Sequence, residues 1–327
     1  MPTEILAVPD PDLVYGLYTG DYKVQLARIA VRLDVFTPLA HGPADAETVA
    51  KACSCDATGM RALLDYLTSL NLLERRGNTY ALTPTADAFL VPGRKTYAGG
   101  VVMNETTPEL WESMLQAFRT GQPTRHAEDW VQDAWLESYS HWQPAKSLEM
   151  WRAAGIEPGR RPGLRLLDLA CGCAVKSLVL AQADPAVRVT CVDRAEVLEV
   201  ARDLADRLHV TSQVTFRPGD LLKDDFGENW FNAILLGQIS YYLTPAQNAG
   251  LFRRIQRTLA PGGKFVIDAI MASDSDAPTE PASFVTALLW AISGGAAHTF
   301  DHYQSWLTDA GFSRVSQLSE RWLVAVK

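Results

Sequence analysis

Blocks of apolar and polar residues in the second half of the chain predict parallel strands separated by helices. Residues 166–181, LLDLACGCAVKSLVLA, start as a buried strand, turn around Gly172 and continue as an apolar helix. Residues 189–193, 213–217, 231–237 and 265–269 are further short strand-like runs. Strands that alternate with helix-length segments in this way are typical of an α/β fold with a parallel sheet.

Acidic residues close the first two of these strands, and a single glycine marks the loop between them. Asp168 ends the first strand and Asp193 the second. An acid about 20 residues beyond a glycine loop is positioned to accept hydrogen bonds from a ribose diol. The loop from Ala170 to Val175 has one glycine where a pyrophosphate-binding loop needs three, and bulky Cys173 narrows it. The pattern favours a nucleoside cofactor without phosphate, such as S-adenosylmethionine, over NAD. The alternative is an ordinary loop followed by a chance acid.

The ends of the later strands carry further motifs in a fixed order. Pro218-Gly219-Asp220-Leu221 follows the third strand, Gln238 follows the fourth, and Pro261-Gly262-Gly263 separates the helix expected over 245–259 from the fifth strand. This order resembles the class I S-adenosylmethionine-dependent methyltransferases over about residues 160–327. The resemblance implies a Rossmann-like sheet, S-adenosyl-L-methionine as the cofactor, and as its binding residues Asp168, Ala170, Gly172, Asp193, Arg194, Asp220, Leu221, Gly237 and Gln238. Asp193 is expected to meet the ribose, Asp220 and Leu221 the adenine, and Gly172 the methionyl end.

The N-terminal part of the chain predicts a long helix followed by a winged-helix pattern. A helix is expected over residues 22–43, shorter ones over 45–53 and 57–70, the latter capped by Asp56, and a hairpin over 72–82 that turns at Gly77-Asn78. This order resembles the dimerisation domain of the plant-type O-methyltransferase family, which includes many bacterial natural-product enzymes. The resemblance implies a winged-helix-like dimerisation domain over 1–103, a helical linker over 104–158 and an S-adenosylmethionine-binding domain over 159–327. Apolar positions around much of residues 13–36 predict a homodimer with intertwined N-terminal elements.

The composition and the net charge of the chain argue against some classes of binding partner. The chain has 327 residues, 47% of them hydrophobic and 21% charged, and a net charge of −8, which argues against nucleic acid. A DNA-binding regulator is the alternative for the winged helix, but its second helix carries only Arg61 and Asp65 as charged residues. No apolar run is long enough to span a membrane, and the start lacks a signal-peptide pattern, so we expect a cytoplasmic protein.

The cysteines predict thiols rather than a metal site or disulfides. The five cysteines include two C-x-C pairs, Cys53/Cys55 and Cys171/Cys173, without a neighbouring histidine. Metal sites need converging ligands at other spacings, and an odd number of cysteines is typical of a reducing compartment. We therefore expect no metal.

Aromatic residues in the linker and after the fifth predicted strand indicate the wall of a pocket for a hydrophobic or aromatic small-molecule acceptor. The linker contains Trp111, Tyr139 and Trp142, and the segment after the fifth strand contains Phe284 and Trp290. Ligand pockets are lined mostly by apolar and aromatic side chains. In the resembled family these two helical segments close over the acceptor, although packing within the linker would account for some of the aromatics.

The position of the catalytic base is where the chain departs from the resembled family. O-methylating relatives have a histidine after the fourth strand in an N-x-x-H pattern, whereas here Gln238 takes the asparagine position and Tyr241 the histidine position. A tyrosine with an ordinary pKa near 10 is a poor base at neutral pH. Three interpretations stay open. Tyr241 only orients the acceptor and proximity supplies the rate; the acceptor is itself acidic or nucleophilic; or another residue, with His298 as the candidate, removes the proton.

The reaction that the resemblance favours is methyl transfer to oxygen. Transfer to carbon is the next interpretation, because carbon-methylating relatives do not need the histidine in the same way. The altered base position also fits an S-adenosylmethionine-dependent cyclisation, elimination or hydroxylation without methyl transfer.

Overall fold

A computed structural model gives the fold and describes residues 12–94, 96–103, 108–124, 144–160, 163–273 and 280–327. The chain divides into two compact units, Met1–Asn104 and Glu105–Lys327, and each is described by itself. No helix in these ranges is both long and apolar enough to cross a membrane.

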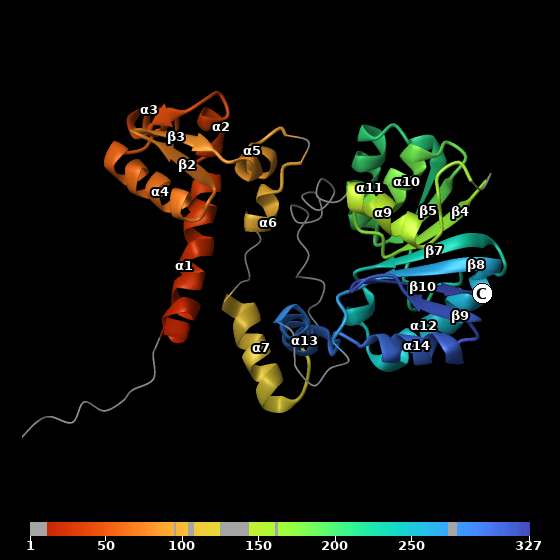
Figure 1. Ribbon diagram of the computed structural model, residues 1–327. Coiled ribbons are helices and arrows are strands. Elements are labelled where there is room, and N and C mark those ends of the chain that lie inside the picture. Colours follow the sequence, from red (N-terminus) through yellow and green to blue (C-terminus); the bar gives the residue numbers. More distant parts are fainter. Residues whose placement is uncertain (1–11, 95, 104–107, 125–143, 161–162, 274–279) are drawn as a thin grey trace, which may run out of the picture. The chain divides into compact units, whose positions relative to one another are not determined.

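The first unit is helical and contains a small antiparallel sheet with the strand order β1-β3-β2 (Figure 1). The capping of α4 and the hairpin confirm the sequence prediction: the Asp56 carboxylate accepts from the N–H groups of Thr58 and Gly59 at 2.9 Å, and β2 and β3 flank Gly77. The elements are α1 (Asp12–Arg32), α2 (Phe36–Leu39), β1 (Ala44–Asp45), α3 (Ala46–Ala52), α4 (Ala57–Ser69), β2 (Leu73–Arg76), β3 (Thr79–Leu82), α5 (Pro84–Leu90) and α6 (Gly99–Met103).

The long helix expected over residues 22–43 is wrong in one respect, because the structure divides it. The first part, α1, ends at Arg32, and Asp34 then has a φ of 54°, in the left-handed region. An L-residue in that conformation cannot continue a right-handed helix, so the chain turns before α2 begins.

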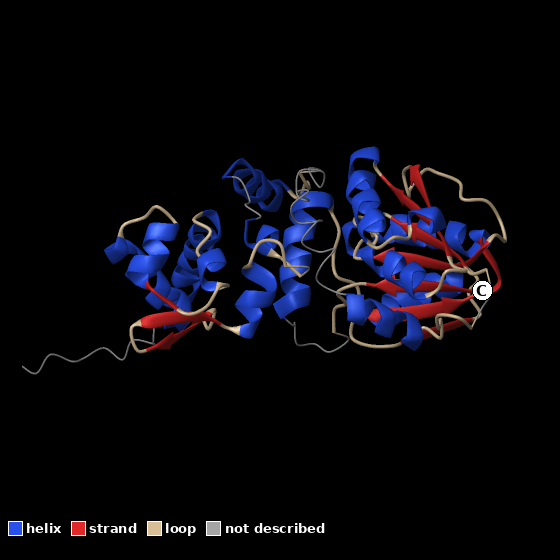
Figure 2. Ribbon diagram, turned by 90° about the horizontal axis from the view of Figure 1, so that it is seen from above, coloured by secondary structure: helices blue, strands red, loops and turns tan. Residues whose placement is uncertain are grey.

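The second unit is built on a seven-stranded sheet with helices on both faces (Figure 2). Its strand order is β6-β5-β4-β7-β8-β10-β9; the strands from β6 to β8 are parallel, and β10 is antiparallel to both neighbours. The strands are β4 (Arg165–Leu169), β5 (Arg188–Asp193), β6 (Val214–Pro218), β7 (Phe231–Gly237), β8 (Leu259–Asp268), β9 (Arg314–Gln317) and β10 (Trp322–Val326). The chain runs outwards from β4 in one direction through β5 and later in the other through β7. Ligands bind at such a switch point, at the carboxyl ends of the strands.

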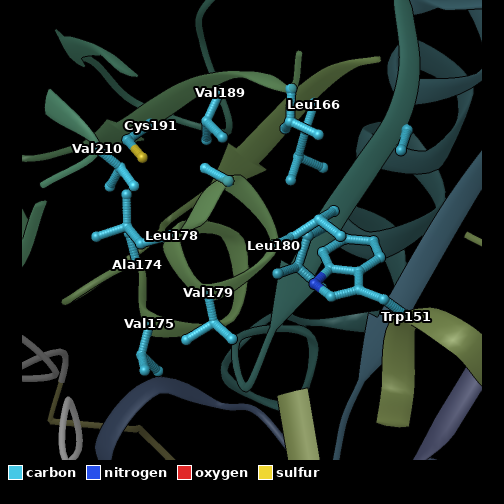
Figure 3. Close-up of a cluster of buried hydrophobic side chains, with 14 of the residues drawn as sticks. Trp151, Leu166, Ala174, Val175, Leu178, Val179, Leu180, Val189, Cys191 and Val210 are labelled. Carbon is cyan, nitrogen blue, oxygen red and sulfur yellow. The ribbon is translucent and has the colours of Figure 1, made fainter. Parts of the chain in front are cut away.

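The helices of this unit divide between two apolar cores, one on each face of the sheet. The first core packs α9 (Pro144–Ala153), α10 (Val175–Ala183) and α11 (Ala195–Arg207) against the strands; Figure 3 shows Trp151 among residues of α10 and β5 in this cluster. The second core packs α12 (Pro245–Thr258), α13 (Glu280–Ser293) and α14 (Phe300–Asp309) on the other face. Helix α7 (Pro108–Thr120) packs against α13, and the short η2 (Thr211–Gln213) and η3 (Ser240–Tyr242) lie within loops. Because both faces are covered, the sheet is open to a ligand at the ends of its strands.

The strand predictions hold closely in this unit, with one shift at the fifth strand. The expected strand over 231–237 is β7, and the expected helix over 245–259 is α12, one residue shorter. The expected strand over 265–269 matches the end of β8, which already begins at Leu259 and ends at Asp268, one residue earlier than expected. The Pro-Gly-Gly run therefore lies inside β8, where the pairing with β7 is irregular between Phe231 and Ala233, rather than in a loop before the strand.

Candidate active site

A cavity of about 520 Å³ opens where β4, β5, β6 and β7 end. The predicted cofactor-binding residues all lie on its wall, together with Tyr241 from η3: Asp168, Ala170, Gly172, Asp193, Arg194, Asp220, Leu221, Gly237 and Gln238. They come from four loops that follow four neighbouring strands. The sheet topology thus brings together residues that span 70 positions from Asp168 to Gln238.

The loop after β4 has an unusual backbone. Ala170, Gly172 and Ala174 have φ values of 50°, 56° and 55°, so every second residue is left-handed. This conformation suits glycine and strains alanine. The loop is held by N–H donation from Cys171 to the Val192 carbonyl at 3.1 Å. Strained backbone of this kind is concentrated at binding sites, where a ligand must approach the main chain closely.

Asp193 connects this loop to the end of β5. Its Oδ2 accepts from the Gly172 N–H and its Oδ1 from the Arg194 N–H, both at 2.8 Å. Burial raises the pKa of Asp193, and the two backbone donors oppose that shift. The carboxylate is therefore fixed in orientation at the cavity wall, with lone pairs left for a ligand's hydroxyl groups.

Asp220 lies in a more open place after β6. Its carboxylate accepts from the Leu222 N–H at 2.8 Å and pairs with Lys223 at 2.9 Å. The Lys223 ammonium, followed by the Leu222 N–H, lowers the pKa of Asp220. Asp220 is therefore an ionised acceptor at this end of the cavity.

A buried charge cluster lies where β4 and α10 meet. Asp168 is the last residue but one of β4 and accepts from the Ser177 hydroxyl at 2.6 Å. Burial raises its pKa to about 7, while Ser177 and Lys176 oppose the shift. Lys176, in the first turn of α10, is 8% exposed and lies on the cavity wall. Its Nζ is 3.3 Å from Oδ2 of Asp268, the residue that closes β8. A lysine is kept here by ion pairing, since an isolated buried charge is costly.

Tyr241 is held by the loop after β7. The Asn248 side chain donates to the carbonyls of Ser240 and Leu243 at 2.8 and 3.2 Å, which fixes the backbone of η3. The Tyr241 hydroxyl donates to Oε1 of Gln238 at 2.6 Å. Gln238 and Tyr241, the two residues that depart from the family pattern, are thus in direct contact at the cavity.

His298 lies outside the residues that line the cavity. It is 6% exposed, packs against Trp306 with ring centroids 4.8 Å apart, and forms a hydrogen bond with the Leu243 backbone. Burial lowers its pKa. Its Nε2 is buried without a hydrogen-bond partner among the residues that the structure covers. His302 caps α14 together with Thr299, as expected for a structural histidine. The geometry therefore brings Tyr241 to the cavity and leaves His298 packed in the core.

Of the residues predicted to form the acceptor pocket, the three that the structure describes do not line this cavity. Trp111 on α7 is 53% exposed and Phe284 on α13 is 61% exposed. Trp290 stacks on Phe118 with centroids 5.3 Å apart, and none of these lines the cavity. Tyr139 and Trp142 lie outside the described residues. The structure does show that α7, which carries Trp111, packs against α13, which carries Phe284 and Trp290.

The five cysteines are free thiols. Cys171 and Cys191 form a hydrogen-bonded pair, which together with burial holds the pKa of Cys171 well above its usual range; burial raises the pKa of Cys173 to about 11. Neutral thiols are poor metal ligands. Within the described ranges, no group of three His, Cys, Asp or Glu side chains could hold a metal ion.

Sequence reasoning missed the two residues that carry the buried ion pair, Lys176 and Asp268. Each had a signal. Lys176 is a charged residue at the start of an otherwise apolar helix, VKSLVLAQA, directly after the glycine loop. Asp268 ends the fifth strand of the pattern, as Asp168 and Asp193 end the first two.

The cavity suits a nucleoside cofactor without phosphate. The fixed Asp193 carboxylate and the ionised Asp220 are acceptors for hydroxyl and amino groups, and they would repel a phosphate. Residues 16–92 match the model of the O-methyltransferase dimerisation domain, and residues 166–263 match that of a methyltransferase domain. The chain belongs to the methyltransferases that carry an O-methyltransferase dimerisation domain. It is an S-adenosylmethionine-dependent methyltransferase of the natural-product type, and S-adenosyl-L-methionine is its cofactor.

Relatives of this methyltransferase transfer methyl groups to more than one kind of atom. The chain is 27% identical to the 3-hydroxy-5-methyl-1-naphthoate 3-O-methyltransferase of Streptomyces sahachiroi, over 93% of this chain and 90% of the relative. It is 26% identical to an N,N-dimethyltransferase of Streptomyces rimosus, over 99% of each. The structure of human N-acetylserotonin methyltransferase in complex with its methyl donor has the same fold, with a TM-score of 0.77, 21% identity and coverage of 98% and 99%.

Proposed function

We propose that this methyltransferase transfers a methyl group to a hydroxyl oxygen of a hydrophobic aromatic small molecule, with Tyr241 orienting the acceptor. The observation that carries the proposal is Tyr241, which lines the cavity in the histidine position of the resembled family and whose hydroxyl donates to Gln238. Proximity and orientation of the reacting atoms account for the rate in this mechanism.

The cofactor-binding residues divide by chemistry. Asp193 would accept from the ribose hydroxyls, Asp220 and the Leu221 backbone would meet the adenine, and the left-handed backbone at Gly172 would lie against the methionyl end. Bound S-adenosylmethionine would supply a methyl group on a positively charged sulfur; an acceptor oxygen would bond to that methyl carbon as its bond to sulfur breaks, with the neutral thioether S-adenosylhomocysteine as the leaving group. The remaining work of the protein is to exclude water and align that oxygen.

Tyr241 aligns the acceptor without removing its proton. A tyrosine phenol ordinarily ionises near pH 10 and is a weak base at neutral pH. The hydroxyl proton of the acceptor therefore leaves to solvent once the oxygen carries the methyl group. His298, packed against Trp306 and outside the cavity lining, is not needed for this step.

The acceptor is proposed to be an aromatic alcohol of two or more rings. One relative is named for a hydroxylated naphthoate, and this supports an acceptor of that size. Trp111, Phe284 and Trp290, with Tyr139 and Trp142 of the linker, are the proposed aromatic wall. Exposed aromatic side chains on α7 and α13 support this assignment, because large exposed apolar groups mark binding surfaces.

The test is product analysis with two variants. Purified enzyme, methyl-labelled S-adenosylmethionine and a panel of hydroxynaphthalenes are expected to give an oxygen-methylated product by mass spectrometry and NMR. Tyr241→Phe should lower kcat by about tenfold or less, since proton transfer by Tyr241 would make the loss on the order of 10²–10⁴. His298→Ala should change kcat by no more than a few-fold. A larger loss in His298→Ala, together with loss of a pH limb near 6.5, would identify His298 as the base instead.

A second candidate is transfer to an amine nitrogen. No histidine is among the described residues that line the cavity, and the chain is similar over its full length to an N,N-dimethyltransferase; both observations favour it. Aminonaphthalenes in the same panel test it, and exclusive N-methylation would replace the first proposal. A carbon-methylated product, or a product without a new methyl group, would reject both.

The first unit is proposed to form a homodimer. Helix α1 exposes eight large apolar side chains: Leu13, Val14, Tyr15, Leu17, Tyr18, Tyr22, Val24 and Ile29. Exposed apolar surface of this extent is typical of an obligate interface, and residues 16–92 match a dimerisation domain. Light scattering at micromolar concentration should give twice the chain mass of 35.9 kDa; a stable, soluble monomer of that mass would reject the assignment.

A further inference from the structure

A chain of polar contacts runs from the Tyr241 hydroxyl to a buried charge at the end of β8. Tyr241 Oη is 2.6 Å from Gln238 Oε1, and Gln238 Nε2 is 3.1 Å from Asp268 Oδ2. Two cations hold the far end: Lys176 Nζ is 3.3 Å from Asp268 Oδ2, and Arg321 Nε is 3.4 Å from Oδ1. Asp268 is 1% exposed, so water does not compete strongly for its oxygens.

The charge on Asp268 fixes the direction of every bond in this chain. A carboxylate between two cations accepts hydrogen bonds and donates none. The Gln238 amide must therefore turn its NH₂ group towards Asp268 and its oxygen towards Tyr241. The Gln238 backbone reinforces this arrangement, because its N–H donates to the Asp268 carbonyl at 2.6 Å while its φ is 64°. Gln238 is thus bound to Asp268 at both its backbone and its side chain.

The same logic fixes the hydroxyl of Tyr241. The amide oxygen of Gln238 can only accept, so the single hydroxyl hydrogen of Tyr241 points towards it. Any further hydrogen bond of the Tyr241 oxygen must then be accepted from its partner. A ligand atom in the cavity that meets this oxygen has to bring a hydrogen with it.

We infer that Asp268, acting through Gln238, leaves the Tyr241 oxygen able only to accept a hydrogen bond from the substrate. The enzyme thereby selects substrates in which the atom that receives the methyl group carries a hydrogen. The inference rests on the proposed orienting role of Tyr241. It names the substrate class as un-ionised hydroxyls and amines with an N–H group. It disfavours carboxylates and phenolates, whose lone pairs would face those of Tyr241. Asp268 and Gln238 are positioning residues in this arrangement, and Lys176 and Arg321 are the cations that pair with the Asp268 carboxylate.

The first measurement tests the direction of the hydrogen bonds between Tyr241, Gln238 and Asp268, and it needs no methyl acceptor. In a ¹⁵N-labelled protein the side-chain NH₂ signals of Gln238 are identified by their absence in Gln238→Leu. These signals are expected to move in Asp268→Asn and to stay nearly unchanged in Tyr241→Phe, which removes only the partner of the amide oxygen. Asp184→Asn is the matched control, because Asp184 is another buried aspartate of the same unit and lies outside the cavity lining. Signals that respond to Tyr241→Phe and ignore Asp268→Asn would overturn the inference.

The second measurement tests the substrate selection. Calorimetry gives the affinity of two probe ligands for enzyme saturated with S-adenosylhomocysteine. 2-Naphthol and 2-naphthoate are the probes, because they share an apolar ring system and differ in whether the polar group carries a hydrogen. In Tyr241→Phe the affinity for 2-naphthol should fall about fivefold, the effect of one hydrogen bond, while that for 2-naphthoate stays the same or rises. Tyr241→Phe leaves the Asp268 ion pairs intact, so this result does not depend on whether Asp268→Asn folds.

The two measurements separate the inference from the function on which it rests. If the Gln238 signals show the expected direction but Tyr241→Phe weakens neither probe, the bond direction stands and Tyr241 does not orient the acceptor, so the proposed function fails. If Tyr241→Phe weakens 2-naphthoate more than 2-naphthol, Tyr241 contacts the acceptor as a donor, and the selection inferred here is wrong.

Discussion

The contact between Asp193 and the ribose is the prediction that the structure quantifies best. Both Asp193 oxygens already accept one backbone N–H at 2.8 Å, so the carboxylate has no freedom to turn away from a bound diol. Two hydrogen bonds to a pre-oriented charged acceptor contribute about 2–3 kcal/mol in total. Asp193→Ala should therefore weaken S-adenosylhomocysteine binding by about 30- to 150-fold.

Truncation of Asp193 also removes the acceptor of the Gly172 N–H, so a change in the ligand is needed to separate the two effects. Isothermal titration calorimetry would compare S-adenosylhomocysteine with its 2′-deoxy analogue on both proteins. In the wild type the analogue should bind about five- to tenfold more weakly, because one of the two bonds is lost. In Asp193→Ala the two ligands should bind within about twofold of each other, since the partner of the hydroxyl is gone.

Asp203→Ala is the control for the loss of one negative charge, because Asp203 is an exposed residue of α11. It should bind both ligands as the wild type does. Equal losses for the 2′-deoxy analogue in the wild type and in Asp193→Ala would refute the reasoning, because the hydroxyl would then have another partner.

Two further perturbations test the loop and the buried acid. Gly172→Val places a β-branched residue at a φ of 56° and should abolish cofactor binding by calorimetry while far-UV circular dichroism is retained; unchanged affinity would contradict it. The pKa of Asp168 is about 7 in the folded protein and near 3.8 in the unfolded chain. Between these two pH values the folded state binds more protons than the unfolded state, so the free energy of unfolding should fall as pH rises from about 4 to 7. Asp168→Asn should remove a pH dependence on the order of 4 kcal/mol from urea denaturation, and parallel pH profiles of the two proteins would reject this.

The sequence predicted the strands and the loop of the second unit well because the constraints there are local. Strand β7, FNAILLG, is apolar or small at every position except Asn232, a short run that is typical of a buried strand. An acid at the end of a strand is placed by the strand itself, so Asp168 and Asp193 lie at the cavity as expected. The break after Arg32 depends on Asp34 taking a left-handed conformation, and no local pattern requires that.

Contacts between distant segments are what the sequence could not supply. Lys176 and Asp268 are 92 positions apart, and their pairing depends on the adjacency of β4, β7 and β8 in the sheet. His298 was named from the sequence as a candidate base, and in the structure it packs against Trp306 of α14. Periodicity predicts the face of a helix or strand on which a residue lies, whereas the residue that it contacts on another strand depends on the whole fold.

The left-handed alanines of the cofactor loop offer a test of whether the loop stores strain. Ala170 is held at a φ of 50°, where an L-residue costs about 1–2 kcal/mol and glycine does not. Glycine adds about 0.5–1 kcal/mol of backbone entropy to the unfolded chain, so Ala170→Gly should raise the free energy of unfolding by about 0.5–1 kcal/mol. Ala249→Gly, in the regular interior of α12, should lower it by about 1 kcal/mol in the same urea denaturation. If Ala170→Gly is as destabilising as Ala249→Gly, the loop is not strained at that residue, and the backbone there is not held in tension for the cofactor.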